Sequence, residues 1–177
     1  MDREARCEVR EMRDAETVRA IHQERGAKGL PLERVYRHLF NPELYLEAYD
    51  KIRRNDGAMT KGATGETVDG TSLQTITRIT ELLRLERYRW TPVRREYIPK
   101  PNGKVRPLGI PTWSDKLVQE VLRSLLEPYY EQRFSTRSHG FRPKRGCHTA
   151  LEQIVRTWKG TTWFIEGDIK GCFDSAS

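Results

Sequence analysis

Hydrophobic residues recur at helical spacing in six stretches of the chain, separated by polar and glycine-rich segments. In chain order, the apolar positions that mark these predicted helices are Ala15, Val18 and Ile21; Val35, Tyr36 and Leu39; Leu44, Ala48 and Ile52; Leu73, Ile76, Ile79 and Leu83; Leu117, Val118, Val121, Leu122, Leu125 and Leu126; and Ala150, Leu151, Ile154, Val155 and Trp158. The chain is therefore expected to be mostly helical.

Local signals refine the expected helix ends. Charged residues of both signs surround the first helix, so we expect it to be solvated. Pro31 suits the first turn of the second helix, and Pro128 is expected to help end the fifth. Thr112 and Asp115 have the spacing of a capping box, which predicts the start of that fifth helix.

Two segments depart from the helical period. Extended runs on either side of Asn102-Gly103 predict an antiparallel hairpin, since Asn-Gly is a strong hairpin signal. Residues 161–167 contain the apolar run Trp163, Phe164 and Ile165, which predicts a strand that ends just before Asp168. Helices with a hairpin and one further strand indicate the α+β class. The glycine-rich stretch 55–70 is expected to be a loop that only a ligand would order.

Positive charge is concentrated in the middle of the sequence. The chain has a net charge of +7, but residues 78–146 hold 16 Lys and Arg against 7 Asp and Glu, whereas the remainder holds 16 against 18. A concentrated cationic segment favours a polyanionic partner such as nucleic acid.

Several other classes of protein are disfavoured. The three cysteines are widely spaced and lack the pairing of a disulfide framework or a zinc site, which indicates a reducing compartment. No apolar run has the length of a membrane span, and the charged start does not resemble a secretory signal. We expect no membrane partner, no secretion, and a location in bacterial cytoplasm or in an organelle.

Three motifs carry candidate chemistry. The hairpin bears Lys100, Lys104 and Arg106, which suit a phosphate clamp, although such charges also protect an exposed sheet edge. The loop 138–146 places Arg142, Lys144 and Arg145 beside an aromatic ring, as in nucleic-acid contacts, but also as in an ordinary charged connection. Asp168, after the predicted strand, suits a divalent metal, or alternatively a helix cap.

The order of these motifs resembles the group II intron reverse transcriptases. A glycine-rich loop is followed by a basic hairpin ending Pro-Leu-Gly-Ile-Pro, a Gly-Phe-Arg-Pro loop, and an Asp with Phe-Asp shortly after it. The resemblance covers about residues 55–174. It implies a helical amino-terminal extension at residues 1–54, a fingers region at 55–160, and the start of an incomplete palm at 161–177.

The resemblance also implies roles for individual residues. The expected deoxynucleoside triphosphate contacts are Lys100, Arg106, Ile169, Lys170, Gly171, Cys172 and Phe173, the last excluding a ribose 2′-hydroxyl. The expected template RNA contacts are Lys61, Leu108, Arg142, Lys144 and Arg145. Asp168 is similar to the first catalytic, metal-binding Asp of the palm, where Mg²⁺ would bind in a complete enzyme. Template or intron RNA and primer DNA are the implied partners.

The family pattern also contains a Tyr/Phe-x-Asp-Asp turn that supplies further metal-binding carboxylates, and this sequence has none. We therefore expect the 177 residues alone not to polymerise DNA. An alternative is a non-catalytic module that binds intron RNA and helps splicing. Another is a reverse transcriptase of the retron or CRISPR-associated kind. The apolar run at Trp163 to Ile165 also raises possible self-association.

Overall fold

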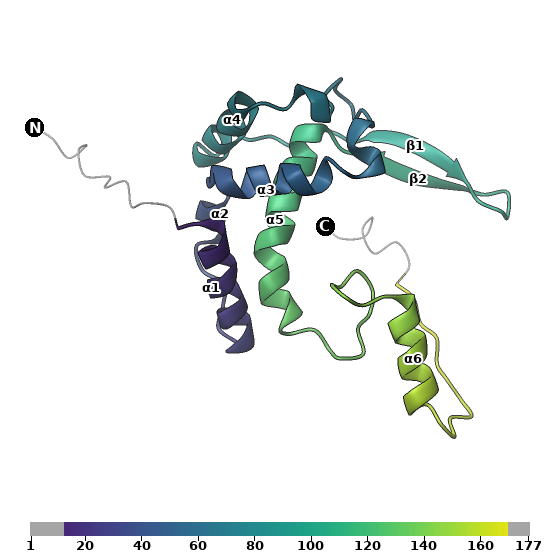
Figure 1. The fold of residues 1–177 in the computed structure, drawn as a ribbon. Coiled ribbons are helices and arrows are strands. Elements are labelled where there is room, and N and C mark those ends of the chain that lie inside the picture. The colour runs from purple at the N-terminus through teal and green to yellow at the C-terminus, as the bar shows by residue number, and fades with distance from the viewer. Residues whose placement is uncertain (1–12, 170–177) are drawn as a thin grey trace, which may run out of the picture. The chain divides into compact units, whose positions relative to one another are not determined.

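The computed structural model describes residues 13–169 (Figure 1). The chain divides at Arg133 into two compact units, the first extending to Arg133 and the second beginning at Phe134. This division reflects which residues pack against one another. The sequence predicted boundaries at residues 54 and 160 from the resemblance to a family, and these functional boundaries stay a prediction.

In the first unit, α5 (Trp113–Glu131) is the central element. Both α1 (Ala15–Ala27) and α3 (Pro42–Ile52) pack against it, and α3 also contacts α4 (Leu73–Arg84) (Figure 1). The apolar stripe of α5 fills the core, where Leu117, Val121 and Leu125 are fully buried. Burial of these side chains is the main source of stability in such a helical assembly.

Helices α1, α3, α4 and α5 begin where the sequence supplies a capping side chain. The side chains of Asp14, Asn41, Ser72 and Thr112 each accept a hydrogen bond from a backbone N–H in the first turn of the helix that follows. At α5 only half of the predicted capping box forms: Thr112 Oγ1 accepts from the Asp115 amide, whereas Asp115 Oδ2 accepts from the Thr112 hydroxyl at 2.8 Å and not from the Thr112 amide. Each cap satisfies amide groups that the helix itself leaves without a partner.

The expectation that the first helix is solvated is wrong. Ala15, Val18 and His22 of α1 are buried against the rest of the unit, and Gly26 lies against the backbone of Tyr129 in α5. One stripe of small or apolar residues is enough to seat a helix whose other faces are highly charged.

Two prolines do not act as expected. Pro31 precedes α2 (Val35–His38) and lies outside the helix. Pro128 lies inside α5, which continues to Glu131. Tertiary contacts hold this last turn, because Tyr129 is buried and its hydroxyl donates a hydrogen bond to the carbonyl of Leu30 at 2.9 Å. Such packing offsets the amide hydrogen bond that proline cannot donate.

The predicted hairpin is confirmed. Strands β1 (Arg94–Pro99) and β2 (Val105–Ile110) pair antiparallel, with Ile98 opposite Arg106. The amide of Gly103 donates to the carbonyl of Lys100, and Gly103 has a φ of 75°. This left-handed conformation closes a three-residue loop with a bulge, so Asn102-Gly103 forms only part of the turn.

The second unit consists of a loop, α6 (Cys147–Thr157) and an extended segment. The helix predicted in this region is confirmed. No residue from 134 to 169 is buried, so its apolar side chains remain accessible to solvent. The strand expected at residues 161–167 is wrong, because these residues have no strand pairing. A strand needs a neighbouring strand for its backbone groups, and apolar side chains alone do not supply one.

The whole described part is α+β, with helices and a single two-stranded sheet. Across residues 13–169, no helix combines the length and the apolar character needed to cross a membrane.

Candidate nucleic-acid interface

The base of the hairpin is fixed by one buried carboxylate. Asp115 in α5 accepts hydrogen bonds from the Tyr88 hydroxyl at 2.7 Å and from the Thr91 amide at 3.2 Å, in addition to the one from Thr112. Burial raises the pKa of the Tyr88 hydroxyl, and its hydrogen bond to Asp115 raises it further, so this hydroxyl stays protonated and donates. The segment that enters β1 is thereby attached to the start of α5.

The strand register assigns the predicted ligand contacts to one face of the hairpin. Arg106 and Leu108 are two residues apart in β2, so their side chains emerge on the same face. The residues opposite them, Ile98 and Glu96, share that face. Arg95 and Tyr97 belong to the other face. Arg106 and Leu108 are both exposed, and Lys100 is exposed at the turn.

The glycine-rich loop 55–70 lies against this hairpin and α5. It contains two short 3-10 helices, Asp56–Met59 and Val68–Gly70. Lys116 of α5 donates to the carbonyls of Gly57 and Thr60, and Ser114 Oγ donates to Glu66 Oε2 at 2.9 Å. The loop therefore has its own anchoring contacts and needs no ligand to acquire this conformation. Lys61 is exposed within it.

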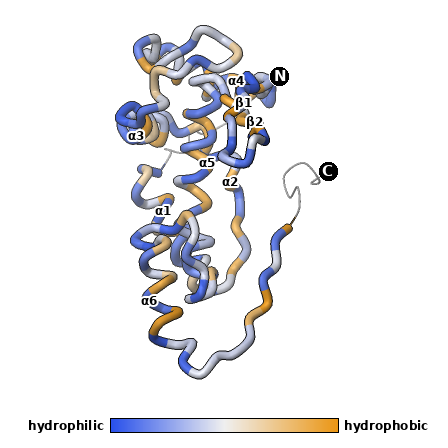
Figure 2. Tube along the Cα trace, turned by 90° about the vertical axis from the view of Figure 1, so that its right-hand side faces the viewer, coloured by the Kyte–Doolittle hydropathy of each residue, from blue (hydrophilic) through white to orange (hydrophobic). Residues whose placement is uncertain are grey.

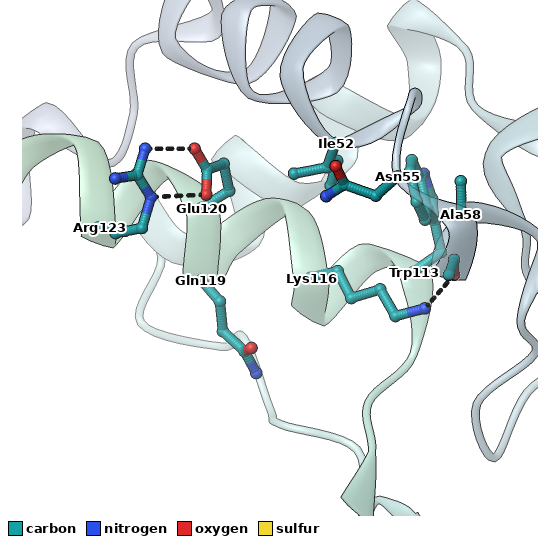
Figure 3. A pocket seen from close by; sticks show the side chains of 9 residues that line it. Ile52, Asn55, Ala58, Trp113, Lys116, Gln119, Glu120 and Arg123 are labelled. Carbon is teal, nitrogen blue, oxygen red and sulfur yellow. Dashed lines mark hydrogen bonds and ion pairs between the residues drawn. The ribbon is translucent and has the colours of Figure 1, made fainter. Parts of the chain in front are cut away.

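A groove of about 350 Å³ opens between the start of this loop, the end of α3 and α5 (Figure 3). Ile52, Ala58 and Trp113 give it apolar walls, and Lys116, Gln119 and Glu120 add polar groups. Burial lowers the pKa of the Lys116 ammonium, whose two carbonyl partners lie beside the groove. The groove does not include any of the site residues predicted from the sequence.

In the second unit, the two predicted arginine contacts are turned toward their own loop. Arg142 Nη1 donates to the carbonyls of Ser135 at 2.8 Å and Ser138 at 2.9 Å, and its guanidinium lies 5.3 Å from the centre of the Phe134 ring. Arg145 Nη1 donates to the carbonyl of Thr136 at 2.6 Å. These donors bind carbonyls that lie outside helices and strands, where backbone partners are fewer.

Lys144 differs from the two arginines. It is exposed with a φ of 58°. His139, in the same loop, contacts Thr149 and Gln153 of α6 through its two ring nitrogens, and so helps to seat the loop on that helix. Of the three predicted cationic contacts in this loop, Lys144 is exposed, whereas Arg142 and Arg145 are partly buried.

The last group of predicted site residues is only partly described. Asp168 and Ile169 are exposed and belong to no helix or strand. Lys170, Gly171, Cys172 and Phe173 lie outside the described residues. Their assignment as nucleotide contacts stays a prediction.

Comparisons with known proteins agree with the order of these motifs. Residues 98–177 match the model of the family described as reverse transcriptase (RNA-dependent DNA polymerase). The group II intron-encoded protein LtrA of Lactococcus lactis subsp. cremoris is 52% identical over 143 residues, which is 80% of this chain and 24% of that protein. Residues 98–177 belong to the reverse transcriptase family, and most of the chain is similar to a group II intron-encoded protein.

Further relatives of this chain are similar in kind. An uncharacterized 91 kDa protein in the cob intron of Schizosaccharomyces pombe is 51% identical over 137 residues, 77% of this chain and 17% of that protein. Nuclear intron maturase 1, mitochondrial, of Arabidopsis thaliana is 34% identical over 104 residues, 50% of this chain and 15% of that protein. The chain thus spans a quarter or less of the length of these relatives.

Polymerases of the reverse transcriptase family generally use Mg²⁺, so we tested whether the residues present fit that ion. Within residues 13–169, no group of three or more His, Cys, Asp or Glu side chains comes together as a metal site. Asp168 lies in an exposed segment, and a magnesium ion needs several oxygen ligands in near-octahedral order. The described residues do not fit a magnesium centre.

Sequence reasoning missed the residues that hold the interface together. Asp115 was predicted as a cap, but not as the partner of Tyr88 and Thr91. Arg94 Nε donates to the carbonyl of Lys61 at 3.0 Å, a contact between residues 33 positions apart. No local pattern reveals such contacts. The one available signal is an acidic residue in the first turn of the helix that directly follows the hairpin.

Proposed function

We propose that this chain forms the fingers region of an RNA-directed DNA polymerase of the group II intron type, where it contacts template RNA and an incoming deoxynucleoside triphosphate. Residues 1–54 would form a helical extension, residues 55–160 the fingers and residues 161–177 the start of the palm. In this role the chain works beside intron RNA, in bacterial cytoplasm or in an organelle.

One observation carries the proposal. The hairpin register gives Arg106 and Leu108 a common exposed face, and Arg94 of the same hairpin holds the loop that carries Lys61. A cation for phosphate oxygens and an apolar side chain for a base face are the two elements that a nucleotide-binding surface requires. Their presence on one scaffold supports a shared template and nucleotide surface.

A second candidate function is binding of intron RNA without catalysis. One relative is named a maturase, and the described residues combine exposed cations with no cluster of metal-binding carboxylates. Phosphate contacts alone would give such a module its affinity. In this case the hairpin would bind RNA, and added deoxynucleoside triphosphate would not displace the RNA from the hairpin.

The first experiment measures RNA binding against salt concentration, with a structured group II intron RNA and an unrelated duplex. We expect steep salt dependence and tighter binding of the intron RNA. Lys144→Ala should weaken binding without changing the fold, whereas Arg142→Ala should also disturb the loop that its guanidinium holds. Lys28→Ala is the matched control, because Lys28 is already paired with Glu24. Absence of binding at low salt would reject both functions for this polypeptide.

The second experiment distinguishes the two functions. A photoreactive deoxynucleoside triphosphate should crosslink to the hairpin, and Arg106→Gln should reduce the yield. Arg95→Gln, on the other hairpin face, removes the same charge and should leave the yield unchanged. Equal loss in both variants would indicate general charge attraction and would favour the RNA-binding module.

A primer-extension assay on an RNA template completes the set. The 177 residues contain no Tyr/Phe-x-Asp-Asp sequence. Because two-metal phosphoryl transfer needs several carboxylates to hold the ions, we expect no nucleotide incorporation by this polypeptide. Nucleotide incorporation that is lost in an Asp168→Asn variant would contradict this expectation.

A further inference from the structure

The backbone on both sides of Lys61 is held by cations from two different elements. Lys116 Nζ, from α5, donates to the carbonyl of Gly57 at 3.0 Å and to that of Thr60 at 3.1 Å. Arg94 Nε, from β1, donates to the carbonyl of Lys61 at 3.0 Å. The two donors reach adjacent carbonyls of the loop, and they fix its path between α5 and the hairpin.

Gly62 adds a third restraint at the next position. It is buried, and a Cβ atom placed on it would lie 2.6 Å from the carbonyl oxygen of Pro111 and 2.8 Å from the Cα of Thr112. Both neighbours are backbone atoms at the point where the hairpin leads into α5, so neither moves aside easily. The loop backbone is in close contact with the scaffold here, which only glycine permits.

The guanidinium of Arg94 is itself held in place. Its Nη1 forms an ion pair with Glu96, which shares the same face of β1. This pair orients the guanidinium so that Nε is directed at the Lys61 carbonyl. The restraint therefore runs from Glu96 through Arg94 to the carbonyl of Lys61, and Lys116 restrains the carbonyl of the preceding residue, Thr60.

The side chain of Lys61 contrasts with its backbone. It is exposed, and it has no hydrogen-bond or ion-pair partner among the residues that the structure describes. A cationic side chain on a fixed backbone is pre-organised for a ligand, because the backbone loses no further freedom on binding. Arg94 and Lys116, by comparison, already use their donors on the protein.

We infer that Arg94 and Lys116 are positioning residues that set the Lys61 ammonium against a phosphate of single-stranded RNA. The inference rests on the proposed function, in which Lys61 contacts the template. It assigns Arg94 and Lys116 no RNA contact of their own. Lys61 provides the charge, and the other two cations determine where that charge lies relative to the hairpin.

The test is a double-mutant cycle on binding of a fluorescently labelled single-stranded RNA across a series of salt concentrations. Lys61→Ala should reduce the slope of log affinity against log salt by about 0.7, the value for one phosphate on a single strand. Arg94→Gln should give the same reduction. The double variant should lose no more than either single variant, since each removes the same phosphate contact.

Two further variants separate positioning from charge. Arg94→Lys keeps a donor that reaches one carbonyl, so it should restore part of the slope that Arg94→Gln loses. Arg95→Gln removes one positive charge from the other face of the same strand and should leave the Lys61 effect intact. Lys116→Met is the parallel variant on α5, and circular dichroism of each protein reports whether it is folded.

The outcomes are distinct. Additive losses from Lys61→Ala and Arg94→Gln would mean that Arg94 contacts RNA by itself, and would overturn the inference while leaving the proposed function standing. A full slope in Arg94→Gln and Lys116→Met, with a reduced slope in Lys61→Ala, would show that Lys61 needs no positioning. An unchanged slope in Lys61→Ala would remove the template contact and the inference together.

Discussion

The two units of the chain contain equally regular helical patterns, but they use them differently. In α4 the repeated apolar residues are buried, with Ile76 and Ile79 each 3% exposed. In α6 the corresponding stripe is open, with Leu151 59% and Val155 74% exposed. Figure 2 shows hydrophobic positions along both α6 and the helices of the first unit. An amphipathic period thus predicts a helix and its apolar face, but not what that face contacts.

The largest effect should come from emptying the core of the first unit. Leu125→Ala removes a fully buried side chain of α5, and we expect a loss of about 2–5 kcal/mol in the free energy of unfolding. Leu151→Ala makes the same change on the open face of α6 and should cost within about 0.5 kcal/mol. Urea denaturation measures both. Similar losses in the two variants would refute the contrast between the units.

Close packing between α1 and α5 gives the next largest effect. A Cβ atom on Gly26 would lie 2.3 Å from the carbonyl oxygen of Tyr129, so Gly26→Ala should destabilise by about 1–3 kcal/mol. Gly140→Ala in the second unit meets no atom within 4 Å and should be neutral or slightly stabilising. The midpoint of thermal unfolding compares them. A stable Gly26→Ala protein would mean that α1 shifts on α5 at little cost.

Helix caps should show a smaller difference. Thr112 is buried and exchanges hydrogen bonds with Asp115, so Thr112→Val should cost about 1 kcal/mol or more. Thr149 caps α6 through Gly146 in a half-exposed setting, and Thr149→Val should cost a few tenths of a kcal/mol. Urea midpoints and helix content by circular dichroism test this order. A larger loss at Thr149 would contradict it.

A pH effect should arise from His38 in the first unit. Burial lowers the pKa of His38, as do the nearby His22 and the positive charges of Arg13 and Arg37. The folded state therefore favours neutral His38. Its contribution is fully present above the unfolded pKa of about 6.5 and is lost as the pH falls below it. Thermal unfolding between about pH 7.5 and pH 5.5 should show this decline, and His38→Gln should flatten it. An unchanged slope in that variant would exclude His38.

The smallest and most specific test concerns self-association. Trp163, Phe164 and Ile165 are 88%, 76% and 101% exposed. Such a run of apolar side chains favours association, so the self-association expected from the sequence stays a prediction. Light scattering over a concentration series should show a rising mass, and Phe164→Ser should reduce it. A constant monomer mass would reject the prediction.

The sequence predicted what depends on neighbours along the chain. The cap at Thr112, the hairpin at Asn102-Gly103 and the helix at residues 147–157 all follow from local chemistry, and so does the family motif order. The prediction of a strand at residues 161–167 was wrong because a strand is defined by its pairing partner, which the local sequence does not show. The role of Arg142 was predicted from its charge, but the structure gives its guanidinium to the loop's own carbonyls.

The part of the candidate interface that escaped prediction depends on distant contacts. Lys61 was selected by resemblance, but Arg94 holds its own carbonyl and Lys116 holds that of Thr60, and these contacts join three separate segments of the chain. The close approach of Gly62 to Pro111 is likewise invisible in a list of loop glycines. Only the folded chain distinguishes this glycine from Gly65, which meets no atom within 4 Å.

The three hydrogen bonds to Asp115 have a consequence for how the hairpin can vary. Tyr88 and Thr91 precede the hairpin, Thr112 follows it, and all three meet at one carboxylate. The segments that enter and leave the hairpin are thus both hydrogen-bonded to the same residue of α5. Adding two residues to each strand would move Lys100 outward by about 7 Å while leaving the helical scaffold as it is. The length of the hairpin, and with it the distance from α5 to Lys100, can therefore change without a change in the helical core.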